Sequence, residues 1–199
     1  MQPTQTLPQH YELAWNLDLK HNQRLNIILQ VIGLGWMVIA GWLLTSCVLW
    51  LRPDYKETLG RGLSGNLLSM LLWLLIVMAV TIALHELTHG VFFWLFSGHK
   101  PEFGIGPGYA FAAMPDWYYP KRKYLVIALA PLLLLSALGL FTSLFVPQTW
   151  LGWLLAGMII NAGGAIGDMY VSWRIARETD RVWVKDTGDG FQLYRRLIE

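Results

Sequence analysis

The sequence predicts an all-α membrane protein with four transmembrane helices and short β segments at the cytoplasmic face. Of its 199 residues, 55% are hydrophobic and only 14% are charged, whereas soluble domains average about 25% charged residues. The mean hydropathy is +0.42. Long stretches carry no formal charge or a single acidic residue. Stretches of about 20 apolar residues are typical of membrane-spanning helices.

Residues 1–26 are predicted to be an N-terminal segment that contains a strand. Apolar and polar or small residues alternate from Tyr11 to Lys20, as in a half-buried strand or in a segment lying on the bilayer surface. The N-terminus is polar and includes two prolines, so we expect no cleavable signal peptide. The first span is predicted at residues 27–51, because no formal charge separates Arg24 from Arg52.

The other three spans are predicted from the same lack of charge, at residues 67–96, 124–146 and 150–173. The connection between the second and third spans contains a glycine-rich run at 104–108, which cannot be helical, and an apolar run at 109–114, which is too short to span. We interpret residues 104–114 as a strand or re-entrant hairpin close to the polar residues of the second span, or as an amphipathic surface loop.

Residues 174–199 form a polar tail, in which two short apolar segments flank a turn and predict a small hairpin. The segments outside the four spans carry 2, 3, 4, 0 and 6 Lys and Arg in chain order. With the N-terminus inside, 12 of them face the cytoplasm and 3 face outward. The positive-inside rule therefore predicts cytoplasmic termini. We expect a multi-pass protein of the cell (inner) membrane, with the lipid bilayer and no nucleic acid as a partner.

The second span contains the hexapeptide HELTHG at residues 85–90. On a helix, His85 and His89 lie one turn apart on one face, where both imidazoles can bind one metal ion. Glu86 is rotated by about 100° around the axis and suits a water on that ion. This HExxH pattern is that of zinc peptidases. The alternative is a polar cluster that joins helices by hydrogen bonds.

Asp168 is the only charge between Lys123 and Arg174 and is the expected third metal ligand. It is predicted about 10 Å from the cytoplasmic end of its helix, at the depth of His89. The alternative is that Asp168 only hydrogen-bonds a histidine that binds the metal. Two acidic residues just past the membrane, Glu178 and Asp180, are weaker candidates for the ligand.

Asn161 precedes Asp168 by two turns and shares its helix face. Three glycines on this helix predict a close approach to a neighbouring helix: Gly163, Gly164 and Gly167. A face of small residues with one amide and one carboxylate suits a helix that completes a buried metal site.

The HExxH sequence and the helix with Asn161 and Asp168 together resemble a family of small bacterial membrane proteins known as putative zincin peptidases. These proteins are similar to intramembrane zinc metalloproteases of the site-2-protease type. The resemblance covers residues from about 67 to 174. It implies one Zn²⁺ ion and the following roles: His85, His89 and Asp168 as zinc ligands, Glu86 as the base, and Asn161 near the substrate backbone.

We therefore expect a membrane-embedded zinc metalloendopeptidase that hydrolyses membrane or membrane-proximal protein substrates. Zinc would activate a water, and Glu86 would accept its proton. Residues 104–114 are expected to offer a strand edge to an extended substrate. The alternatives are a zinc-dependent membrane hydrolase of a non-peptide substrate and a non-catalytic metal-binding membrane scaffold.

Overall fold

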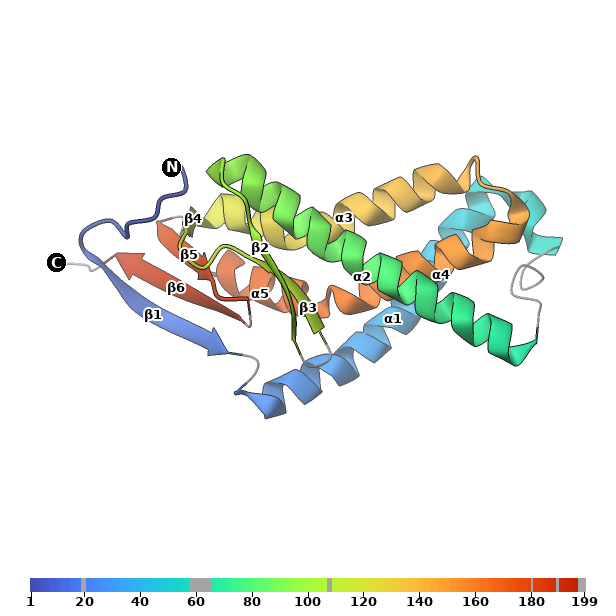
Figure 1. Ribbon diagram of the computed structural model, residues 1–199, viewed down its shortest axis with the longest axis horizontal. Helices are drawn as coiled ribbons and strands as arrows, with labels where there is room; N and C mark the ends of the chain where they lie inside the picture. Colours follow the sequence, from blue (N-terminus) through green and yellow to red (C-terminus); the bar gives the residue numbers. More distant parts are fainter. Residues whose placement is uncertain (19–20, 58–65, 107–108, 180, 189, 197–199) are drawn as a thin grey trace. The chain divides into compact units, whose positions relative to one another are not determined.

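The computed structural model describes residues 1–18, 21–57, 66–106, 109–179, 181–188 and 190–196 (Figure 1). Its elements in chain order are β1 (Tyr11–Asp18), α1 (Gln23–Leu51), the 3-10 helix η1 (Pro53–Glu57), α2 (Leu67–Ser97), β2 (Glu102–Gly106), β3 (Tyr109–Ala113), β4 (Tyr118–Pro120), α3 (Lys121–Ser143), α4 (Gln148–Gly164), α5 (Ile166–Ala176), β5 (Val182–Asp186) and β6 (Gly190–Arg196). Within these residues the chain divides into two units, which are described in turn.

Among the described helices, α1, α2 and α3 are each long and apolar enough to cross a membrane. The pair α4 and α5 would make a fourth span, but it is bent by 42°. The predicted fourth span at 150–173 therefore corresponds to two helices that meet at Ala165, where the sequence predicted one helix. Three glycines flank this break, and glycine weakens a helix because its backbone is the most flexible.

Helix α3 begins at Lys121, three residues before the predicted span. A search for uncharged segments misses its first turn because that turn is basic. The ammonium group of Lys121 donates to the backbone carbonyls of Ala176 at 3.0 Å and Glu178 at 2.6 Å. The first turn of α3 is thereby joined to the end of α5.

The first unit comprises Met1–Gln30, Glu86–Ala130 and Gly167–Glu199. It contains an antiparallel sheet of order β1-β6-β5-β4 (Figure 1). The predicted N-terminal strand and C-terminal hairpin are confirmed, and both lie in this sheet. The sequence did not predict β4, which has only three residues, nor the pairing of the two chain ends. Two buried residues of β5 and two of β6 form the core with α2, α3 and α5: Val182, Val184, Phe191 and Leu193.

A hydrogen-bonded contact joins the sheet to α3. The hydroxyl of Tyr124 donates to the carboxylate of Asp186 at 2.7 Å, and the backbone N–H of Gly188 donates to the same carboxylate at 2.8 Å. Burial raises the pKa of Asp186 to about 6, against the lowering effect of these two donors. The C-terminal hairpin thus contributes a hydrogen-bonded acid to the interior of the first unit.

Strands β2 and β3 form a separate antiparallel hairpin, which confirms the strand interpretation of residues 104–114 apart from 107–108, which lie outside the described residues. This hairpin packs on α2 at Gly90. A Cβ at Gly90 would overlap the ring of Phe103, with 2.8 Å to Cε1, and would lie 3.3 Å from Cγ of Pro101. The last residue of the HELTHG hexapeptide therefore permits β2 to approach the helix closely.

The second unit comprises Val31–His85 and Pro131–Ile166. Glycines bring its helices together: Gly139 lies against Met158, and Gly163 lies against Met37. The predicted close approach is confirmed for Gly163. It is wrong for Gly164 and Gly167, where a Cβ would meet nothing within 4 Å.

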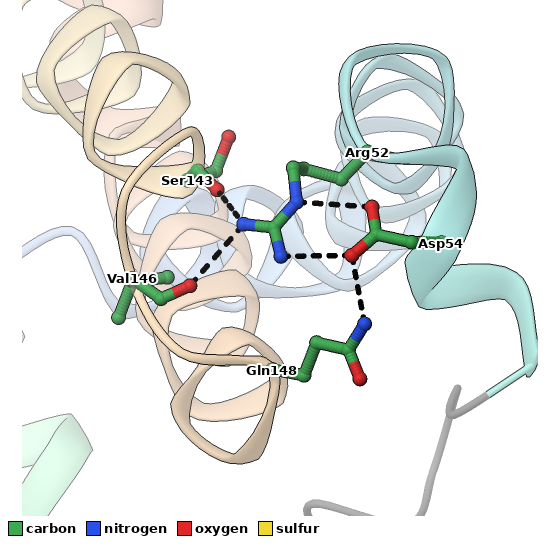
Figure 2. Close-up of polar contacts among 5 residues, drawn as sticks. All are labelled: Arg52, Asp54, Ser143, Val146 and Gln148. Atoms are coloured by element: carbon green, nitrogen blue, oxygen red, sulfur yellow. Dashed lines mark hydrogen bonds and ion pairs between the residues drawn. The ribbon is translucent and has the colours of Figure 1, made fainter.

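The Arg52 cluster, made of Arg52, Asp54, Ser143, Val146 and Gln148, also lies in the second unit (Figure 2). The guanidinium donates to the carbonyls of Ser143 at 2.9 Å and Val146 at 3.2 Å. It also forms two bonds to the Asp54 carboxylate, at 3.0 and 2.9 Å. Gln148 donates to the same carboxylate at 2.7 Å. Hydrogen bonding to Arg52 lowers the pKa of Asp54 to about 2.

Candidate metal centre

The HELTHG hexapeptide lies inside α2, so His85 and His89 are one helical turn apart. Both histidines are buried, with 9% of each residue exposed. A buried imidazole needs partners for its ring nitrogens, because an unsatisfied polar group in the interior costs free energy. The partners found for the two Nδ1 atoms determine which ring nitrogen can bind a metal.

Within the second unit, Nδ1 of His85 lies 2.9 Å from Oδ1 of Asn161. The amide nitrogen of Asn161 donates to the carbonyl of Pro131 at 3.1 Å, which fixes the orientation of the amide group. Because Oδ1 can only accept, Nδ1 of His85 carries the hydrogen. Nε2 then has the lone pair that a metal requires.

Within the first unit, Nδ1 of His89 lies 2.9 Å from the carbonyl oxygen of Ile127. A carbonyl oxygen also only accepts, so this ring nitrogen is again the donor. Nε2 of His89 points to Asp168, whose Oδ1 is 3.5 Å away. Both histidines are therefore held by Nδ1 in the tautomer that presents Nε2.

Asp168 lies in the first turn of α5, immediately after the bend from α4. One ligand atom each from His85, His89 and Asp168 can be chosen so that all three lie within 4.8 Å of one another. His89 and Asp168 belong to the first unit. His85 immediately precedes Glu86, at which the α2 segment of the first unit begins. The three ligands predicted from sequence are thus brought together among the described residues.

Glu86 follows His85 on α2 and is bound from β3. The backbone N–H of Ala112 donates to Oε2 of Glu86 at 2.9 Å. This bond directs the N–H of Ala112 toward the helix and not toward Phe103, the residue that Ala112 faces on β2. The β2–β3 hairpin therefore lies next to the predicted base, as expected for residues 104–114.

Asn161 is 3% exposed, and both ends of its amide have partners, namely His85 and the carbonyl of Pro131. This is the arrangement of a residue that orients a metal ligand. The prediction that Asn161 contacts the substrate stays a prediction. Of the weaker ligand candidates, Glu178 binds Arg195 at 2.7 and 2.8 Å, and Asp180 lies outside the described residues.

Three groups at this site were missed from the sequence, and all three belong to the backbone: the carbonyls of Ile127 and Pro131 and the N–H of Ala112. Every residue has a backbone, so residue type alone gives no direct signal for such contacts. One signal was present, since Pro131 stands in the interior of a predicted span and proline disturbs the hydrogen bonds of a helix.

The sequence profile of the family described as "Putative zincin peptidase" matches residues 65–183, which is more than half of the chain. The chain belongs to this family. The matched region holds the whole candidate centre, from His85 to Asp168. Searches of curated proteins and of solved structures found no match.

Zincin peptidases are named for zinc, and the donor set at this centre suits that ion. Two neutral imidazoles and one carboxylate are a common ligand set for catalytic zinc, which keeps a further position for water. The hydrogen bonds on both Nδ1 atoms are of the kind that orient metal-binding histidines. His85, His89 and Asp168 would therefore hold the ion.

Proposed function

We propose that this chain is a membrane-embedded zinc endopeptidase that cleaves membrane or membrane-proximal proteins. The observation that carries the proposal is the grouping of ligand atoms from His85, His89 and Asp168 within 4.8 Å, beside Glu86 on the same helix. Membership of the zincin family supports peptide hydrolysis. The apolar helices support a location in the cell membrane, and the Lys and Arg distribution supports cytoplasmic termini.

The chemistry follows from the positions of the side chains. A zinc ion held by the three ligands would acidify a water molecule and polarise the peptide carbonyl. Glu86 takes a proton from the attacking water and delivers it to the leaving amine, so that one peptide bond and one water become a carboxylic acid and an amine. The N–H of Ala112 orients the Glu86 carboxylate for this work.

The outer edge of β3 supports binding of an extended substrate. The backbone N–H of Ala112 points away from β2 and toward Glu86. The Ala112 N–H is already bound to Glu86, so a substrate segment that adds to this edge would pair with other backbone groups of β3 and lie with its peptide bonds alongside the proposed base. Main-chain pairing of this kind requires an extended substrate and tolerates many side chains.

The test is cleavage by detergent-purified protein that carries zinc, measured with quenched-fluorescence peptides derived from single-span membrane segments. Glu86→Gln should keep the zinc content and lower the cleavage rate by a factor of about 100 or more, because it removes the proton acceptor. His99→Ala is the matched control, since His99 is exposed just beyond α2, where it hydrogen-bonds to Ser97 and packs on the ring of Trp117.

Cleavage that survives Glu86→Gln would overturn the role of Glu86. A zinc-loaded wild type that cleaves none of the peptides but hydrolyses a lipid ester would instead favour the non-peptide hydrolase. Zinc without hydrolysis of either would favour the metal-binding scaffold.

A further inference from the structure

Pro131 stands in the interior of α3, ten residues after its first residue. In an α-helix, the N–H of each residue donates to the carbonyl four residues earlier. Proline has no N–H, so the carbonyl of Ile127 lacks the donor that residue 131 would otherwise supply. A buried carbonyl that loses its donor must find another one or remain unsatisfied at a cost in stability.

His89 supplies a donor to this carbonyl. Its Nδ1–H reaches the oxygen of Ile127 at 2.9 Å, and both residues are buried, with 2% of Ile127 and 9% of His89 exposed. The bond fixes the tautomer of His89 and the plane of its ring. As a result Nε2 faces Asp168, 3.5 Å from Oδ1.

The same proline also acts on the other histidine. The carbonyl of Pro131 accepts from Asn161 at 3.1 Å, and Asn161 in turn accepts from Nδ1 of His85 at 2.9 Å. Because Pro131 has no N–H, the Ile127 carbonyl accepts from His89. The carbonyl of Pro131 itself accepts from the Asn161 amide, which binds His85.

We propose that Pro131 is a positioning residue of the metal centre: by leaving the Ile127 carbonyl to His89, it holds His89 in the metal-binding orientation. This inference rests on the proposed zinc site, and it concerns metal binding rather than cleavage. A proline that only bends α3 would have no effect on the choice of tautomer at His89.

The experiment restores the missing N–H. Pro131→Ala supplies a donor that competes with His89 for the Ile127 carbonyl, and Pro131→Val does so while filling more of the space that the buried ring occupies. Pro147→Ala is the matched control, since Pro147 precedes α4 and lies outside any helix interior. Zinc affinity is measured by competition with a chelator, the absorption spectrum of the Co²⁺-loaded protein reports ligand geometry, and thermal unfolding is followed without metal.

Both Pro131 variants should bind zinc about 10-fold or more weakly and give an altered Co²⁺ spectrum. Pro131→Val gains a helix N–H and keeps the buried volume filled, so its metal-free thermal midpoint should stay near that of wild type. Pro147→Ala should match wild type in zinc affinity. Wild-type zinc affinity and an unchanged Co²⁺ spectrum in either Pro131 variant would overturn the inference.

Failure of the inference and failure of the proposed function give different results. If wild type binds zinc and both Pro131 variants bind it more weakly, the inference holds even if no peptide is cleaved. If wild type cleaves peptides and the Pro131 variants keep full zinc affinity, the inference fails and the peptidase assignment stands.

Discussion

The Arg52 cluster and the metal centre both bind carbonyls of α3 or of the turn that follows it, but those carbonyls are available for different reasons. Ser143 ends α3, and Val146 lies in the turn after it, so their carbonyls lack helical donors in any case. Arg52 binds them there, where a cation is also favoured by the helix dipole. The Ile127 carbonyl is released inside the helix, and only because residue 131 is proline. Proline in a helix interior costs about 3 kcal/mol.

The difference extends to where the polar groups point. In the Arg52 cluster, the guanidinium, the carboxylate and the amide of Gln148 bond to one another and to the backbone (Figure 2). In the metal centre, hydrogen bonds hold Nδ1 of both histidines, and one ligand atom each from His85, His89 and Asp168 lie within 4.8 Å of one another. The first arrangement is suited to stability and the second to binding a cation. Changes in the two regions should therefore affect different measurements.

The largest of these effects is expected for Asn161→Ala. This change removes the acceptor for Nδ1 of His85 and should weaken zinc binding about 10- to 100-fold. Chelator competition measures it, with Asn161→Asp as the conservative control, because an aspartate oxygen can still accept from His85. If Asn161→Ala leaves zinc affinity unchanged and only raises KM for peptide, Asn161 contacts the substrate instead of orienting His85.

A smaller effect, and on a different quantity, is expected for Arg52→Ala. The change leaves two backbone carbonyls and the Asp54 carboxylate without their shared donor. It should lower the free energy of unfolding by about 1–2 kcal/mol. Thermal unfolding in detergent measures this loss, and the zinc affinity of the variant should equal that of wild type. A loss of zinc affinity in Arg52→Ala would remove the distinction between the two regions.

The smallest effect is expected for Asp54→Asn, and it depends on pH. The pKa of Asp54 is lowered to about 2 from its usual value, so its ionised form stabilises the folded protein. That contribution is complete above the unfolded-state pKa near 4 and is lost as the pH falls toward 2. Thermal midpoints measured from pH 5 to pH 2 should therefore fall less in Asp54→Asn than in wild type. Identical pH profiles would show that this exposed ion pair contributes nothing to stability.

The sequence predicted the helices well because hydrocarbon excludes charge, so an uncharged run marks a span. It placed the start of α3 too late, because Lys121 and its neighbours belong to the helix although they are charged. It also missed the bend at Ala165, since a run of apolar residues predicts an apolar environment for a helix but not the direction of its axis.

The metal ligands could be predicted from the sequence because charged and polar residues are rare in apolar segments. His85, Glu86, His89 and Asp168 are polar groups in apolar segments, where each needs a partner. Their backbone partners could not be predicted in this way. The carbonyl of Ile127 is recognisable only through Pro131, four residues later, and the N–H of Ala112 only through the three-dimensional position of β3.

The central claim is that His85, His89 and Asp168 form a zinc site, and the metal content of purified protein tests it most directly. Wild type and Asp168→Ala would be purified in detergent, supplied with zinc, desalted and assayed for metal, with Glu86→Gln as the control that keeps all three ligands. We predict about one zinc per chain in wild type and Glu86→Gln, and a loss or marked weakening in Asp168→Ala. Absence of zinc from all three proteins would contradict the account, because the hexapeptide would then be a polar packing cluster.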